Sequence, residues 1–222
     1  MSDQENMRQE MENYDAYIFD LDGTLLDTLR DLAASTNHAM RTYHLPEHSI
    51  DEVRRFVGNG VSKLIERAVP DGKANPLFAP ALDTFREHYL IHQCDTTKPY
   101  PGIMPLLRRL KEAGKATAVV SNKFDAATKA LCQRFFGPLI DVAIGESEQV
   151  ARKPAPDTVI EALRLLGISS QRAVYVGDSE VDLATAANCA MPCISVLWGF
   201  RDRDCLVAHG AKVFATQPAD IF

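Results

Sequence analysis

The sequence lacks the marks of several classes of protein. Its 24 Lys and Arg residues are outnumbered by 30 Asp and Glu residues, for a formal net charge of −6, and no basic stripe of the kind that binds nucleic acid is present. No run of about 18 apolar residues occurs, so we expect no membrane-spanning helix. An anionic substrate would therefore be held by local positive charges or by a metal, because the net charge of the protein is negative.

Cysteine is scarce, and a targeting signal is lacking. The five cysteines are an odd number and are widely scattered, at Cys94, Cys132, Cys189, Cys193 and Cys205. Residues 1–15 are acidic and polar, without the basic start and apolar stretch of a signal peptide. We therefore expect reduced thiols and a cytoplasmic location. Cys189 and Cys193 are interpreted as small buried side chains rather than metal ligands.

Hydrophobic residues are plentiful, at 46% of 222 residues, which is enough for one large or two small domains. Short β-branched runs predict strands at Tyr17–Phe19, Ala116–Val120, Val142–Ile144, Ala173–Val176, Cys193–Leu197 and Val213–Ala215. Helical patterns lie between them, at Met104–Ala113, Ala126–Phe136, Asp157–Leu166 and Val181–Cys189. Because strands alternate with helices, we expect an α/β fold of the Rossmann-like kind, with a parallel sheet covered on both faces.

The segment from residue 28 to residue 98 shows helical periodicity without a convincing strand. The expected helices are Thr28–Tyr43, Ile50–Phe56, Val61–Val69 and Pro76–His92. An all-helical insert between the first two strands of an α/β sheet resembles a cap domain. We therefore expect a core formed by residues 14–27 and 99–222, a helical cap over 28–98, and a polar N-terminal extension over 1–13.

Candidate site residues come directly after the first predicted strand. Asp20 and Asp22 stand there, and Gly23 allows the chain to turn. The carboxyl ends of strands are where open α/β sheets bind ligands. Two carboxylates beside a buried strand are costly unless something compensates for their charge. Taken alone, the pair is explained equally well by a solvated Asp-Gly turn.

Later strand ends add polar groups of other kinds. The hydroxyl of Ser121 and the amide of Asn122 can hold a phosphoryl oxygen, although such a pair is also common in turns. Lys153 precedes Pro154, which restricts the backbone of the residue before it; an ordinary surface lysine is the alternative. Asp178 follows another strand and Asp182 lies one helical turn later, on the same side of the helix start.

These groups gain meaning as a set, although Asp178 alone would pass for a helix cap. Clustered carboxylates repel one another unless a divalent cation joins them. Hard oxygen ligands of this kind suit Mg²⁺, which commonly bridges to phosphate. The sequence therefore predicts a magnesium site at one edge of the sheet.

The order Asp-x-Asp-x-Thr, Ser, Lys-Pro and Gly-Asp-x-x-x-Asp resembles the haloacid dehalogenase-like hydrolase superfamily, over nearly the whole chain after Tyr14. Within that superfamily, residues 27–40, 54–68 and 197–200 resemble the phosphoglycolate phosphatases, except that Arg30 stands where Pro is usual. The resemblance implies that Asp20 is a nucleophile that becomes an aspartyl phosphate. It also implies that Asp22 protonates the leaving group and then activates water, as a general acid and base.

The same resemblance implies roles for the remaining residues. Mg²⁺ would be held by the side chains of Asp20 and Asp178 and by the backbone carbonyl of Asp22, with Asp182 as a ligand through water or as an orienting residue. Ser121 and Asn122 would hold the phosphoryl group, and Lys153 would offset its charge. Thr24 would lie among the substrate-binding residues, where it is interpreted as structural or cap-orienting.

Substrate choice is expected to lie in the cap. Gly58, Asn59 and Gly60 precede a predicted helix with Lys63 in its first turn, and backbone N–H groups at such a helix start can bind an anion such as a substrate carboxylate. A plain helix–helix turn is an equal alternative. Trp198 and Phe200 are expected to pack a loop.

Together these features predict a Mg²⁺-dependent phosphomonoesterase acting on a small organic phosphate such as 2-phosphoglycolate, with no nucleic-acid or membrane partner, as a monomer or homodimer. Asp22 argues against a dehalogenase or a phosphonoacetaldehyde hydrolase, which lack the second aspartate. A β-phosphoglucomutase-like enzyme and a pyrophosphatase of the same superfamily stay open. A phospho-accepting receiver-type switch uses similar groups, but it is about one small domain long and needs no helical cap.

Overall fold

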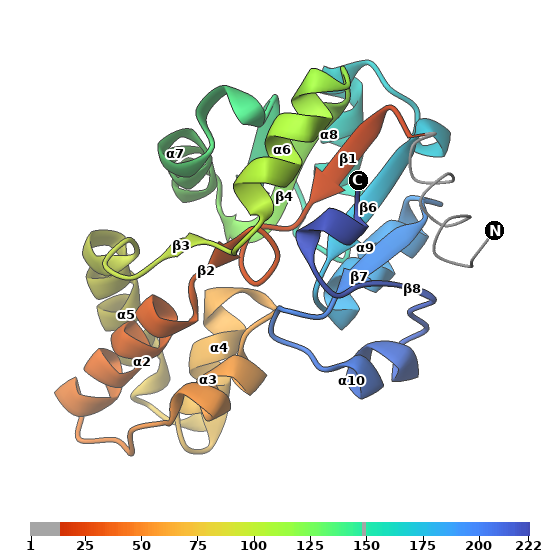
Figure 1. Ribbon diagram of the computed structural model, residues 1–222. Coiled ribbons are helices and arrows are strands. Elements are labelled where there is room, and N and C mark those ends of the chain that lie inside the picture. Colours follow the sequence, from red (N-terminus) through yellow and green to blue (C-terminus); the bar gives the residue numbers. More distant parts are fainter. Residues whose placement is uncertain (1–13, 148–149) are drawn as a thin grey trace. The chain divides into compact units, whose positions relative to one another are not determined.

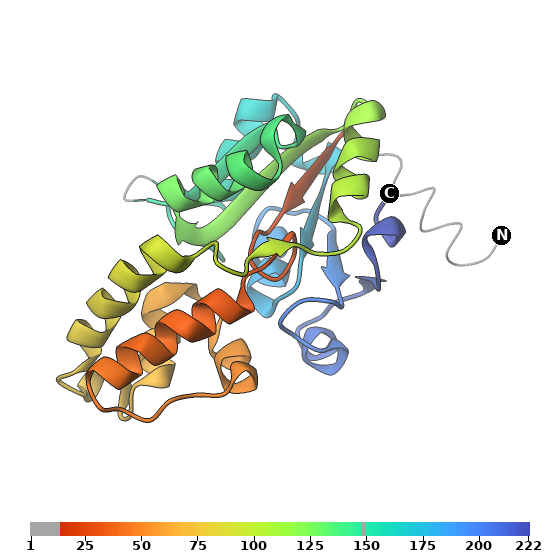
Figure 2. The same ribbon diagram turned by 60° about the vertical axis from the view of Figure 1, so that its left-hand side comes forward.

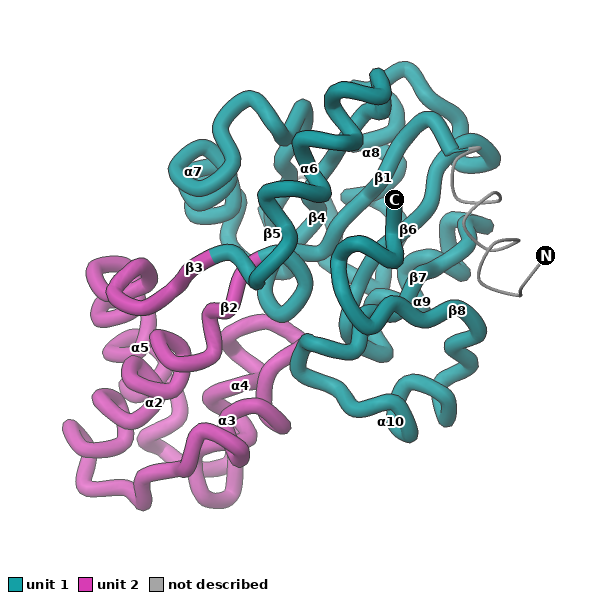
Figure 3. The backbone as a smooth tube through the Cα atoms, viewed as in Figure 1, with its two compact units in different colours: residues 1–25, 99–222 teal, residues 26–98 magenta. Residues whose placement is uncertain are grey.

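The computed structural model of the chain describes residues 14–147 and 150–222. The polar extension expected over residues 1–13 lies outside the described residues. The structure divides into two units, coloured separately in Figure 3: unit 1 runs up to Leu25 and from Pro99 to Phe222, and unit 2 runs from Leu26 to Lys98.

Unit 1 is built on a six-stranded sheet with the strand order β5-β4-β1-β6-β7-β8. Every neighbouring pair of strands is parallel. The strands are β1 (Ala16–Phe19), β4 (Ala116–Phe124), β5 (Val142–Glu146), β6 (Ala173–Gly177), β7 (Cys193–Val196) and β8 (Val213–Ala215). The predicted α/β fold with a parallel sheet is therefore confirmed.

Helices cover both faces of this sheet (Figures 1 and 2). Along β1 and its neighbours, Ile18, Val120 and Tyr175 pack with side chains from α8 and α9, in one buried cluster. Helix α6 lies on the opposite face in both views. The helices of unit 1 are α6 (Ile103–Glu112), α7 (Asp125–Phe135), α8 (Asp157–Leu166), α9 (Glu180–Asn188) and α10 (Arg203–Ala208), with short 3₁₀ turns at Gly137–Leu139, Ser170–Arg172 and Pro218–Asp220.

Strand β4 is longer than its hydrophobic run predicts. The expected strand ends at Val120, whereas the observed one continues to Phe124, and its register against β5 shifts between these two residues. Ser121 and Asn122 therefore lie within the strand and are buried. The predicted strand is too short because polar residues normally mark the end of a strand. Here the polar residues Ser121 and Asn122 continue the strand at the edge of the sheet.

Unit 2 is helical, with α2 (Leu29–Thr42), α3 (Ile50–Phe56), α4 (Gly60–Ala68), the 3₁₀ turn Gly72–Ala74 and α5 (Phe78–His92). Two-residue strands, β2 (Leu26–Asp27) and β3 (Lys98–Pro99), pair where the chain passes between the units. Helix α3 begins at Ile50 because Ser49 and Glu52 form a capping box. None of the helices in the described ranges combines the length and the hydropathy needed to span a bilayer.

Asp31 ties the two ends of unit 2 together. Its buried carboxylate, near the start of α2, accepts hydrogen bonds from the backbone N–H and the hydroxyl of both Thr96 and Thr97, at 2.6–3.1 Å. Burial alone would raise the pKa of Asp31, but these hydrogen bonds lower it below its ordinary value. The carboxylate therefore stabilises the folded unit in its charged form.

We expect Asp31→Asn to lower the free energy of unfolding by about 1–3 kcal/mol at neutral pH, because an amide nitrogen would replace one of these acceptors. In the wild-type protein the same contribution is present at neutral pH and is lost as the pH falls through the lowered pKa of Asp31. Urea unfolding at neutral and acidic pH measures both effects. Asp83→Asn, at an exposed position of the same unit, is the matched control; equal unfolding midpoints for the two variants would contradict the assignment.

Candidate active site

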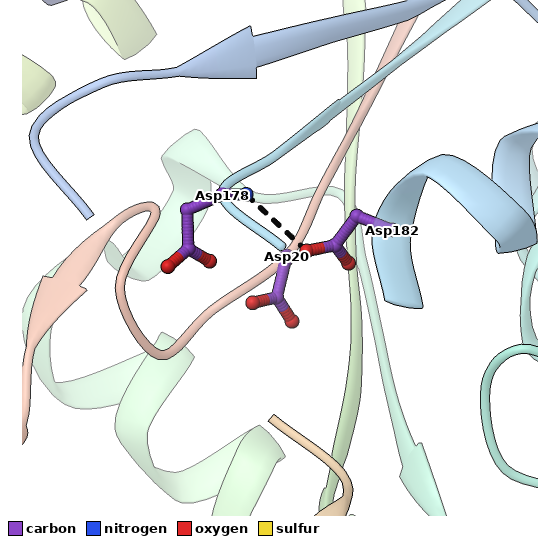
Figure 4. A group of neighbouring side chains, drawn as sticks. All are labelled: Asp20, Asp178 and Asp182. Carbon is purple, nitrogen blue, oxygen red and sulfur yellow. Dashed lines mark hydrogen bonds between the residues drawn. The ribbon is translucent and has the colours of Figure 1, made fainter. Parts of the chain in front are cut away.

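Three buried carboxylates meet at the carboxyl edge of the sheet in unit 1 (Figure 4). Asp20 directly follows β1, Asp178 directly follows β6, and Asp182 lies in the first turn of α9. One carboxylate oxygen from each lies within 4.8 Å of the others. The exposed fractions of these residues are 8%, 1% and 1%, so water does little to screen their charges.

Lys153 is the cation buried among these carboxylates. Its Nζ donates to Oδ1 of Asp20 at 2.6 Å, to Oδ1 of Asp182 at 2.8 Å and to the hydroxyl of Tyr175 at 3.0 Å. Burial would lower the pKa of Lys153, but the charges of Asp182 and Asp20 raise it above its ordinary value. The ammonium is therefore held charged, with its three hydrogens directed at the site.

The carboxylates carry more negative charge than Lys153 can balance. Burial raises the pKa of Asp20 well above its ordinary value, the charges of Asp182 and Asp178 add to this, and Lys153 opposes it. Burial and Asp182 raise the pKa of Asp178 to about 7, against the lowering effect of the Phe200 N–H. A cluster of hard oxygen donors with excess negative charge fits a divalent cation such as Mg²⁺.

Asp182 is the most fully hydrogen-bonded of the three carboxylates. Its Oδ2 accepts from the N–H and hydroxyl of Ser179, at 3.1 and 2.6 Å, and from the N–H of Asp178 at 3.2 Å. Its Oδ1 accepts from Lys153 and from the Tyr175 hydroxyl. The resemblance implies one of two roles for Asp182, and this arrangement favours orienting its neighbours over binding a cation through water.

Asp22 lies apart from this cluster. Its Oδ1 is 3.3 Å from Nζ of Lys123, and both side chains are largely buried, with exposed fractions of 17% and 8%. A carboxylate outside the group that Asp20, Asp178 and Asp182 form suits proton transfer better than metal binding. The sequence pattern alone does not identify Lys123 as the neighbour of Asp22.

The polar residues of β4 organise the same edge. The hydroxyl oxygen of Ser121 accepts the Lys123 N–H at 3.2 Å, and the side-chain amide of Asn122 donates to the backbone carbonyl of Lys153 at 3.0 Å. Asn122 thus links the strand to the segment that carries the buried lysine. Thr24 donates to Oδ1 of Asp178 at 3.2 Å, which makes it a support for that carboxylate.

The predicted cap residues belong to unit 2. Gly58 and Gly60 adopt positive φ angles, 124° and 78°, on either side of Asn59, which precedes α4. Lys63 pairs with Glu66 at 2.6 Å, and its side chain is 42% exposed. These residues form a turn and the start of a helix, and the two positive φ angles favour glycine at positions 58 and 60.

Tyr175 is a site residue that sequence reasoning missed. It looks like one more hydrophobic residue of strand β6, yet its hydroxyl contacts both Lys153 and Asp182. A buried tyrosine hydroxyl needs a partner, but the sequence does not say which residue supplies it.

Comparison with known proteins connects this geometry to a family. A family model described as haloacid dehalogenase-like hydrolase matches residues 17–196. A phosphoglycolate phosphatase from Mesorhizobium japonicum is 36% identical over 192 residues, covering 84% of each chain. Another from Aquifex aeolicus is 32% identical over 184 residues, covering 82% of this chain and 84% of that one.

The solved structures agree with the sequence relatives. A candidate phosphoglycolate phosphatase from Lactobacillus delbrueckii subsp. bulgaricus superposes with a TM-score of 0.91 and 34% identity. The match covers 94% of this chain and 97% of that chain. The similarity therefore extends over both units of the structure.

Proposed function

The chain belongs to the haloacid dehalogenase-like hydrolase family and is a phosphatase, and from this premise we propose that it is a Mg²⁺-dependent phosphomonoesterase acting on a small organic phosphate such as 2-phosphoglycolate. The reaction proceeds through an aspartyl phosphate on Asp20. The observation that carries the proposal is the buried group of Asp20, Asp178 and Asp182 around Lys153.

The metal would be held by the side chains of Asp20 and Asp178 and by the backbone carbonyl of Asp22, with Asp182 orienting the group. When bound, Mg²⁺ would neutralise negative charge and polarise the phosphoryl oxygens. Asp182 keeps Asp178 and Lys153 in place through its hydrogen bonds to both. The fit rests on the donor set, which consists of oxygen atoms and carries excess negative charge.

Asp20 is the proposed nucleophile. Lys153 binds Oδ1 of Asp20, which leaves Oδ2 to attack the phosphorus. A carboxylate is a weak nucleophile toward a phosphate dianion, so the charge of Lys153 is needed at this point. The new P–O bond forms on Asp20 while the bond from phosphorus to the substrate oxygen breaks. Ser121 and Asn122 hold the transferring phosphoryl group.

Asp22 transfers the protons in both halves of the reaction. It gives its proton to the departing alkoxide in the first half, and in the second half it takes one from the water that attacks the phosphoenzyme. The water leaves as part of inorganic phosphate, and Asp20 is regenerated. Lys123, 3.3 Å from Oδ1 of Asp22, stabilises the deprotonated carboxylate that forms midway.

A substrate screen with Mg²⁺ tests this function. Phosphate release is measured over 2-phosphoglycolate, hexose phosphates, nucleotides and pyrophosphate. We expect many phosphates released per chain, with 2-phosphoglycolate giving the highest kcat/KM. Preference for a hexose phosphate or for pyrophosphate would favour the alternatives within the superfamily, and release of about one phosphate per chain would favour a receiver-type switch.

The loop Gly58–Gly60 is the proposed site for the substrate's carboxylate, through the backbone N–H groups that begin α4. Gly60→Val would fill the space next to that backbone and strain a residue with φ of 78°. We expect the KM for phosphoglycolate to rise by about tenfold, which corresponds to the loss of about one charge-assisted hydrogen bond. Steady-state kinetics with p-nitrophenyl phosphate, which has no carboxylate, should show little change.

Two results separate this role from its alternatives. Equal losses on both substrates, or none on either, would make the loop a plain turn. Lys63→Ala tests the neighbouring cation: selective weakening of phosphoglycolate would assign the carboxylate to Lys63 as well, whereas its pairing with Glu66 leads us to expect no change.

A further inference from the structure

The segment Trp198–Arg201, between β7 and α10, attaches to the catalytic edge of unit 1 at several points. The indole N–H of Trp198 donates to the backbone carbonyl of Thr24 at 3.0 Å. The backbone N–H of Phe200 donates to Oδ2 of Asp178 at 2.6 Å. Since Thr24 itself donates to Oδ1 of Asp178, both oxygens of this carboxylate are held, one directly and one through Thr24.

Two glycines allow the segment to approach this closely. A Cβ atom on Gly199 would clash with the side chain of Asp178. A Cβ on Gly23 would clash with the same carboxylate and would lie 2.8 Å from the ring of Phe200, and Gly23 also has a φ of +91°. The Asp178 carboxylate is therefore enclosed between the turn after β1 and the Trp198–Arg201 segment.

An ion pair fixes the far end of the segment. Arg201 binds Glu180 through two hydrogen bonds, at 2.8 and 3.2 Å, and its side chain is 11% exposed. Glu180 is the first residue of α9, the helix that also carries Asp182. The segment is thus anchored to the turn after β1, to Asp178 and to the start of α9.

We propose that Trp198–Arg201 is a positioning segment that sets the orientation of Asp178 for binding the divalent cation. This inference rests on the proposed metal-dependent function. A carboxylate has about four lone-pair positions. Phe200 and Thr24 occupy two of them, so the remaining lone pairs of the Asp178 carboxylate point in a fixed direction. The hydrogen bond from Trp198 holds Thr24 in place and so maintains the orientation of this carboxylate.

The first test uses the unmodified protein, because Trp198 is its one tryptophan. Mg²⁺ is titrated while tryptophan emission is recorded, and the binding constant is measured in parallel by calorimetry. We expect tryptophan emission to change with a midpoint equal to the one measured by calorimetry. We expect Asp178→Asn to abolish this emission change. Calorimetric binding without any emission change would overturn the role of the segment.

The second test weakens the segment. Trp198→Phe keeps an aromatic ring and removes the N–H, and we expect Mg²⁺ binding about 2- to 10-fold weaker. Gly199→Ala displaces Asp178, and we expect a loss of about 10- to 100-fold. Tyr43→Phe removes one hydrogen bond, to Thr84 in unit 2, and should leave Mg²⁺ affinity unchanged. Thermal unfolding without metal shows whether each variant is folded.

The outcomes distinguish this inference from the proposed function. If the wild-type protein binds no Mg²⁺, the metal-dependent function fails and the inference fails with it. If the wild-type protein binds Mg²⁺ without an emission change, or if Trp198→Phe binds Mg²⁺ as tightly as the wild type, the segment is only structural and the proposed function is untouched.

Discussion

Replacing Asp20 by Asn is expected to lower kcat for phosphoglycolate by about a hundredfold or more, since removing a nucleophile typically costs several orders of magnitude. The amide keeps the shape of the side chain, but it lacks the negative charge that attacks phosphorus, and it offers a cation one neutral oxygen in place of two charged ones. Lys153 would also lose one of its two charged partners, the Asp20 Oδ1 at 2.6 Å. Steady-state phosphate release measures the effect.

Asp15→Asn is the matched control for this variant. Asp15 stands just before β1, at the opposite end of the strand from Asp20, where its exposed carboxylate pairs with Arg172. We expect this control to keep kcat within about twofold, because exposed ion pairs contribute little to stability. Near wild-type phosphate release by Asp20→Asn would rule out Asp20 as the nucleophile.

Asp22→Asn is expected to lower kcat by about 10²- to 10⁴-fold, the usual contribution of general acid–base catalysis. Its backbone carbonyl is unchanged, and the Asp22 side chain lies outside the group that Asp20, Asp178 and Asp182 form, so Mg²⁺ binding should persist. With p-nitrophenyl phosphate, whose leaving group needs no proton, formation of the phosphoenzyme should be affected less than its hydrolysis.

Calorimetry with Mg²⁺ provides the control for this second variant. If Asp22→Asn abolished Mg²⁺ binding while remaining folded, Asp22 would be a side-chain ligand and its acid–base role would be wrong. Loss of activity with metal binding retained separates the two aspartates, which stand only two positions apart in the sequence.

The polar residues at the strand ends could be predicted because parallel strands bring their carboxyl ends to one edge. Asp20 and Asp178 are adjacent in space for this reason, since β1 and β6 are neighbouring strands. Asp182 follows from the helical spacing of four residues after Asp178. These predictions need only the alternation of strands and helices, which the hydrophobic pattern indicates clearly.

Other features depend on contacts between distant parts of the chain, and no local pattern reports them. The partners of Lys153 come from the residue after β1, from β6 and from α9. In the sequence Tyr175 resembles an ordinary core residue, whereas in the structure its hydroxyl is hydrogen-bonded to Lys153 and Asp182. Trp198 and Phe200 are expected from the sequence to pack a loop, and the spacing of residues does not predict their hydrogen bonds to Thr24 and Asp178. Helix capping, by contrast, is local: Ser49 and Glu52 are three residues apart.

The most direct measurement of the central claim is detection of the phosphoenzyme. Asp22→Asn is mixed with p-nitrophenyl phosphate and Mg²⁺, quenched in acid, digested at low pH and analysed by mass spectrometry. The account predicts one phosphoryl group per chain, on Asp20, and none in the Asp20→Asn variant. A phosphoryl group on another residue, or none on a variant that still releases p-nitrophenol, would contradict it.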